Sequence, residues 1–222
     1  MRLLALASLL ALVAGCSGID AREPLPPTSG ATYDGSIAVS VTATYAPTDP
    51  TAFNTPGRYS PAIDAPSVTK HATSVLEERK VSGHSDARAA TLDVSVSRAD
   101  IKYDGQTGVF AFKVFFTVFF FPVDFPNYFI SSDKFSLRLQ AKWKLTEKNQ
   151  TVAEGIAEGK QSGKFGDFSR GWYFVGYLRM PSPLNGEEFQ SIADTLLPGA
   201  QESLAEQLVL EVERALAEKK KD

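Results

Sequence analysis

The side chains best suited to chemistry in this 222-residue chain are few and far apart in the sequence. The two histidines, His71 and His84, could bind a metal ion with the help of a carboxylate, because neutral imidazole is a common metal ligand. His71 falls within a predicted helix and His84 within the turn 83–85, so nothing in the spacing brings them together. The sequence therefore favours two solvated histidines, and neither a metal ion nor another cofactor is expected.

Two carboxylate pairs, Asp93 with Asp100 and Glu154 with Glu158, could supply a general acid and a general base for hydrolysis. All four residues also fit the solvent-facing side of predicted strands. The patterns HExxH, GxSxG, a phosphate-binding glycine loop and an EF-hand loop are absent from the sequence. We therefore expect a protein that is not an enzyme, with a hydrolase lacking a recognisable motif as the alternative.

Cys16 is the only cysteine of the chain. It follows a positive charge at Arg2, an apolar run over 3–13 and the small residues Ala14 and Gly15, which is the layout of a secretory signal peptide. The apolar run is too short to span a bilayer as a helix, which takes about 20 residues. A lone cysteine also excludes a disulfide within the chain and a cysteine metal cluster.

The stretch Val13-Ala14-Gly15-Cys16 resembles the lipobox of bacterial lipoproteins, an aliphatic residue and two small ones before a cysteine. The resemblance implies that residues 1–15 are removed and that Cys16 is acylated, with palmitate among the expected chains. Several acyl chains make a durable anchor, because each buried methylene adds about 0.8 kcal/mol. Ser17 stands where an aspartate would imply retention at the inner membrane, so the outer membrane is expected, facing the periplasm. A signal peptide without lipidation, followed by an incidental cysteine, is the alternative.

Residues 16–35 are predicted to form a flexible tether between this anchor and a single folded domain over 36–222. Pro24, Pro26 and Pro27 favour an extended chain, which at about 3.1 Å per residue reaches some tens of ångströms. The net charge of −3 offers no basic surface for nucleic acid, so no nucleic-acid partner is expected.

Periodicity predicts an α+β fold. The predicted elements are a strand over 36–45, a helix over 67–80, strands over 92–103, 109–121, 135–145 and 151–160, a short strand within 172–178, and a long helix over 185–219. In the first helix, Val68, Ala72, Val75, Leu76 and Arg79 recur at helical spacing. The order indicates an antiparallel meander sheet of four to six strands, with a short helix and a long C-terminal helix on one face.

The stretch 109–130 contains nine of the fifteen phenylalanines. Charged residues and prolines interrupt it too often for a transmembrane helix. Its first half, 109–121, is predicted to be a central strand that returns from a turn at 104–108. Its second half cannot continue a strand ladder because of Pro122 and Pro126. The candidates for contact with a protein or lipid partner are Phe121, Phe125, Tyr128 and Phe129. The alternative is that these rings are buried in the domain's own core.

The element order over most of 36–218 resembles that of outer-membrane assembly and secretion-accessory lipoproteins, such as the lipopolysaccharide-assembly lipoprotein family. The resemblance lies only in that order and in the lipidated start, without a functional motif matched residue by residue. It implies a non-catalytic binding or assembly module, anchored in the outer membrane, that contacts an envelope protein or a lipid.

Overall fold

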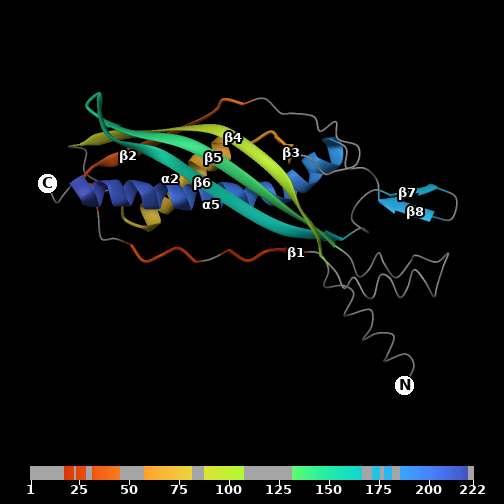
Figure 1. Cartoon of the computed structure of the whole chain (residues 1–222). Helices are drawn as coiled ribbons and strands as arrows, with labels where there is room; N and C mark the ends of the chain where they lie inside the picture. The colour runs from red at the N-terminus through yellow and green to blue at the C-terminus, as the bar shows by residue number, and fades with distance from the viewer. Residues whose placement is uncertain are drawn as a thin grey trace, which may run out of the picture.

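A twisted β-sheet lies across two helices in this computed structural model, as Figure 1 shows. The structure describes residues 18–22, 24–28, 32–45, 58–81, 88–107, 132–166, 172–175, 178–181 and 186–219. The main sheet contains β1 (Gly18–Ile19), β2 (Ser36–Ala43), β3 (Arg58–Tyr59), β4 (Ala89–Thr107), β5 (Ser132–Glu147) and β6 (Gln150–Gly166). A separate two-stranded sheet pairs β7 (Trp172–Val175) with β8 (Leu178–Pro181), where the sequence predicted one short strand.

The strand order is β1-β6-β5-β4-β2, with β3 paired to β4 beside this path. Every pairing in the main sheet is antiparallel except that of β2 with β4, which is parallel from Ser36↔Ala89 to Ala43↔Val96. The α+β class is confirmed, but the purely antiparallel meander is wrong. A parallel pair needs a crossover connection, and the helix between β2 and β4 lies within that connection.

Strands β5 and β6 form a hairpin where the sequence predicted strands over 135–145 and 151–160, and both strands are longer than predicted. Lys148 and Asn149 both have positive φ, at 49° and 64°, as a two-residue turn of type I′ requires. On β5 the side chains from Phe135 to Leu145 that point inward are buried, and those between them are mostly solvated. This alternation is the signature of a sheet with one face in the core and one in water.

The second half of β4 differs from what the sequence predicted. A β-bulge interrupts the pairing with β5 as a register shift between Val96 and Arg98. The turn expected at 104–108 is absent, because the strand continues to Thr107 and pairs with β5 up to Thr107↔Ser132. The position beside β4 predicted for 109–121 is therefore taken by β5, and 109–130 lies outside the described residues.

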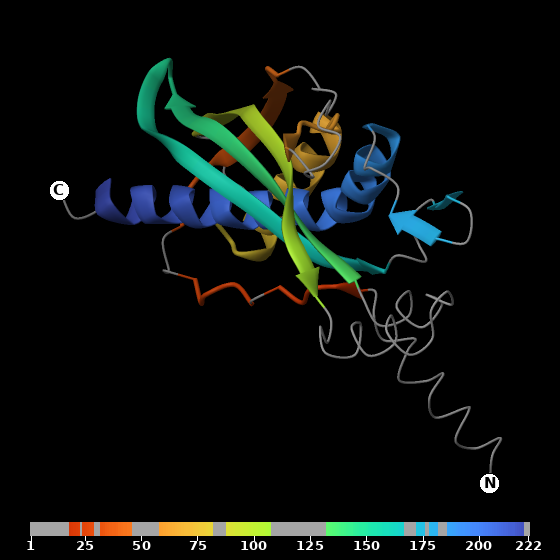
Figure 2. The same cartoon turned by 45° about the vertical axis from the view of Figure 1, so that its right-hand side comes forward.

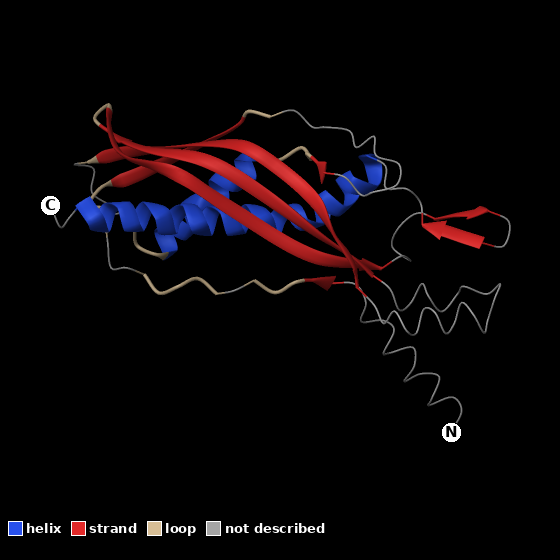
Figure 3. Cartoon of the chain, in the orientation of Figure 1, coloured by secondary structure: helices blue, strands red, loops and turns tan. Residues whose placement is uncertain are grey.

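Both predicted helices are confirmed and cover the same face of the sheet, as Figure 3 shows. Helix α2 (Ala65–Glu78) carries Pro66 in its first turn, where a missing N–H costs little, and buries Val68, Ala72 and Leu76. Helix α5 (Gly186–Lys219) continues through Pro198 and changes direction near its beginning (Figure 2). Its predicted apolar stripe is buried at Leu196, Leu204, Leu208 and Val212. Asn185, where this helix was predicted to begin, lies outside the described residues.

Small residues on β6 let α5 approach the sheet closely. A Cβ on Gly159 would lie 2.4 Å from the carbonyl oxygen of Ala200 and 2.5 Å from the backbone nitrogen of Leu204. Such distances leave no room for a side chain at this crossing. The absence of a side chain at Gly159 therefore allows the backbone of α5 to pack directly against β6.

Candidate functional site

The N-terminal strap, described at 18–22 and 24–28, lies along the molecule beside β6 and α5 (Figure 1). It begins with β1, which pairs antiparallel with the end of β6 at Gly18↔Lys164 and Ile19↔Gly163. The chain reaches the opposite end of the molecule at Asp34, where Arg88 links it to Glu147 at the end of β5. The strap and the residues after it thus span the sheet lengthwise.

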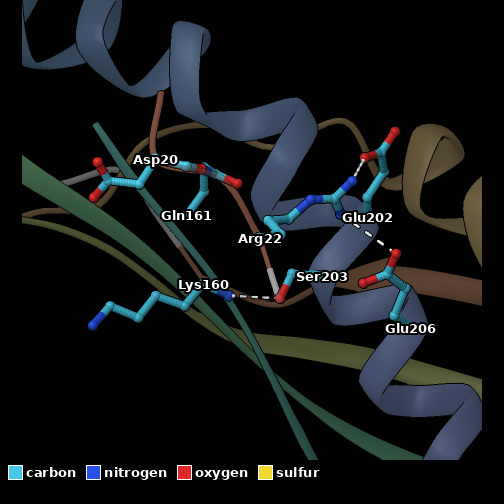
Figure 4. Close-up of polar contacts among 7 residues, drawn as sticks. All are labelled: Asp20, Arg22, Lys160, Gln161, Glu202, Ser203 and Glu206. Carbon is cyan, nitrogen blue, oxygen red and sulfur yellow. Dashed lines mark hydrogen bonds and ion pairs between the residues drawn. The ribbon is translucent and has the colours of Figure 1, made fainter. Parts of the chain in front are cut away.

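Asp20 and Gln161 hold the first part of the strap against β6 (Figure 4). The backbone N–H of Asp20 donates to the carbonyl of Ser162 at 2.9 Å. The buried Gln161 amide donates to the carbonyl of Asp20 at 2.8 Å and to that of Ser162 at 3.0 Å. The Lys134 ammonium lies 3.2 Å from the Asp20 carboxylate. Backbone and side chain of Asp20 are therefore both fixed to the sheet.

Arg22 links the strap to α5. Its guanidinium pairs with the Glu202 carboxylate and lies 3.6 Å from a carboxylate oxygen of Glu206 (Figure 4). Burial raises the pKa of Glu206, and the Arg22 guanidinium opposes that rise. Further on, Arg79 donates to the carbonyl of Pro26 at 3.0 Å. Partly exposed ion pairs contribute about 0–1 kcal/mol each to stability. No single ion pair therefore holds the strap in place, and its attachment depends on the sum of these weak contacts and the hydrogen bonds of the Gln161 amide.

A hollow of about 510 Å³ lies between the strap, β6 and α5. Its lining includes Arg22 and Leu25 of the strap, Gln161 of β6, and Ser203 and Glu206 of α5. The Ser203 hydroxyl accepts the backbone N–H of Lys160 at 3.2 Å, so the helix closes part of the β6 edge that the strap leaves open. The strap thus forms one wall of this hollow, and β6 and α5 form the others.

The sequence predicted a flexible tether over 16–35, and the described residues 18–22 and 24–28 of that range contact the folded domain. Prolines exclude a helix but suit an extended chain beside a sheet edge. The edge of β6 offers unpaired backbone groups, which such a chain can bind. Neither Arg22 nor Gln161 was singled out from the sequence, because a lone cation and a lone glutamine carry no pattern.

A second hollow, of about 720 Å³, lies on the outer face of the sheet, away from the helices. Its lining includes Ser40, Asp93, Lys142, Lys144, Glu154 and Ile156. Lys144 stands in register between Asp93 on β4 and Glu154 on β6, so charges of opposite sign alternate across the strands. Trp143 lies on the core side of the sheet and is 4% exposed. The arrangement is that of a solvated sheet face.

The candidate carboxylate pairs do not come together. Seven residues of strand separate Asp93 from Asp100, or about 23 Å at the rise of a β-strand, and four separate Glu154 from Glu158, or about 13 Å. A hydrolytic pair lies within about 10 Å. Asp93 accepts the Ser40 hydroxyl and Asp100 pairs with Arg98, so both have structural partners.

The remaining site predictions fall partly outside the described residues. His71 is on α2, while His84, Cys16 and the aromatic candidates Phe121, Phe125, Tyr128 and Phe129 lie in ranges that the structure does not describe. Within the described ranges, no group of three or more His, Cys, Asp or Glu side chains could hold a metal ion. None of the described helices is long and apolar enough to cross a membrane.

The chain matches no protein-family model and no curated protein. Seven chains of solved structures match it. One is a protein from Caulobacter crescentus CB15, provisionally described as a lipoprotein, with a TM-score of 0.33 and 13% identity. The alignment covers 83% of this chain and 90% of that one. A likeness at this level carries no argument about function.

Proposed function

We propose that the protein is a lipid-anchored lipoprotein of the bacterial envelope, held in the outer membrane and facing the periplasm. The observation that carries this proposal is the leader. A positive charge, an apolar run, two small residues and Cys16 follow one another in the order that signal cleavage and acylation require. The matched solved structure is of a protein provisionally described as a lipoprotein, which agrees with the proposal without supporting it independently.

The activity we propose is that of a non-catalytic binding or assembly module for an envelope protein or a lipid. Two observations favour it over the hydrolase alternative. Neither of the predicted carboxylate pairs, Asp93 with Asp100 and Glu154 with Glu158, lies close enough along its strand to act as a hydrolytic pair. The described polar groups along the strap are engaged in holding the chain to the domain. In this proposal the aromatic residues Phe121, Phe125, Tyr128 and Phe129 provide the partner or lipid contact.

The anchor is tested by Cys16→Ser. We expect the variant to leave the membrane fraction or to accumulate as the uncleaved precursor, because an oxygen replaces the sulfur that takes the lipid. The measurement is fractionation, with mass spectrometry of the mature N-terminus. Ser17→Ala serves as the matched control and should remain in the membrane. An unmodified Cys16 in the mature wild-type protein contradicts the proposal.

A further inference from the structure

The chain enters and leaves the described fold at one end of the main sheet. Gly18, the first described residue, pairs with Lys164 near the end of β6. At the same end Ser132 begins β5 opposite Gly166, and Thr107 ends β4 opposite Ser132. Neighbouring strands are about 4.8 Å apart, so Gly18 on β1, Ser132 on β5 and Thr107 on β4 lie within about 15 Å of one another across the sheet. Figure 1 shows this end on the opposite side of the molecule from the C-terminus.

The pairing of the strap with the domain limits how far the domain can lie from the lipid anchor on Cys16. Cys16 lies only two residues before Gly18, so its Cα is within about 7 Å of the sheet end even in a fully extended chain. A free tether over 16–35 would reach about 60 Å. The described residues 18–22, 24–28 and 32–34 instead lie along the length of the domain, as far as the Asp34–Arg88 pair. An acyl anchor on Cys16 would hold this end of the sheet close to the lipid.

The amino-acid composition between Thr107 and Ser132 also favours a position of this sheet end close to the lipid. The 24 residues between Thr107 and Ser132 include nine of the fifteen phenylalanines. The described surface at this end carries Ile19, which is 56% exposed, and the exposed ammonium of Lys164. Large apolar side chains and a lysine suit the boundary between acyl chains and phosphate headgroups.

We propose that the sheet end formed by Gly18, Thr107, Ser132 and Gly166 rests on the bilayer surface. The β5–β6 turn and the end of α5 point into the periplasm. The proposal rests on the lipid anchoring of Cys16 and specifies the orientation that this anchoring imposes. The long axis of the domain is then roughly perpendicular to the membrane. The strap connects the acylated Cys16 to the folded domain and fixes this orientation.

The test places a fluorophore on a single introduced cysteine in the acylated protein, bound to phosphatidylethanolamine–phosphatidylglycerol vesicles containing a nitroxide-labelled lipid. Lys164→Cys reports the proposed contact end. Thr151→Cys is the matched control, because it is exposed on the same strand about 43 Å away. We expect strong quenching at position 164 and none at position 151.

A third variant, Asp20→Pro, removes the N–H that binds the Ser162 carbonyl and the carboxylate that pairs with Lys134. Combined with Lys164→Cys, it should lose most of the quenching while the protein stays on the vesicles. Equal absence of quenching at both positions in vesicle-bound protein overturns the orientation and leaves the anchor standing. Stronger quenching at position 151 overturns it as well. Failure of the wild-type protein to bind vesicles overturns the anchor and the orientation together.

Discussion

Arg79 and Glu213 form a buried ion pair between α2 and α5. The guanidinium donates twice to the carboxylate, at 2.9 and 2.8 Å, and the two side chains are only 8% and 2% exposed. The hydrogen bonds that the Arg79 guanidinium donates to the Glu213 carboxylate raise the pKa of Arg79. Arg79 stood at a helical interval with the apolar residues of α2 in the sequence, so its inward position could be predicted. Its partner, 134 residues further along the chain, could not.

We predict that Arg79→Ala destabilises the protein by about 3–5 kcal/mol, because it leaves the Glu213 carboxylate buried without a counter-charge. Urea denaturation of wild type and variant measures the change. The double variant Arg79→Met with Glu213→Leu should recover most of the loss, since neither charge then remains buried. A loss below about 1 kcal/mol for Arg79→Ala would mean that the pair behaves like an exposed one.

At the scale of elements, the crossing of β6 and α5 depends on Gly159. We predict that Gly159→Ala lowers the free energy of unfolding by about 1–3 kcal/mol, because the new methyl group would meet helix backbone that cannot rotate away. Gly18→Ala is the control, since nothing lies within 4 Å of a Cβ at that position. Thermal melts of both variants measure the difference. Equal melting temperatures would show that α5 moves away from the strand without cost.

At the scale of the whole molecule, the core is one layer of side chains between the sheet and the two helices. Leu208 lies in that layer with no exposed surface. We predict that Leu208→Asp unfolds the domain or removes most of its stability, because the carboxylate would be buried without a partner. Ser191→Asp, on the exposed side of the same helix, should melt like wild type. Circular dichroism on heating provides the measurement, and an unchanged melting temperature for Leu208→Asp contradicts the docking of α5.

The sequence alone determined the features that depend on local periodicity or order. The helix over 67–80, the strands over 135–145 and 151–160 and the long C-terminal helix were each predicted from the spacing of apolar residues that are close in the sequence. The arrangement of the leader before Cys16 is equally local, and it predicts the anchor that we propose. These signals need no partner from elsewhere in the chain, so the residues themselves suffice to predict them.

Only the tertiary structure decided which distant segments meet. The parallel pairing of β2 with β4, the antiparallel pairing of β4 with β5, and the pairing of β1 with β6 each join segments whose own patterns allow several partners. An extended, proline-rich chain is equally compatible with water and with a sheet edge. Its place is fixed by the edge of β6 and by the amide of Gln161, which lies 141 residues further along the chain than its partner Asp20.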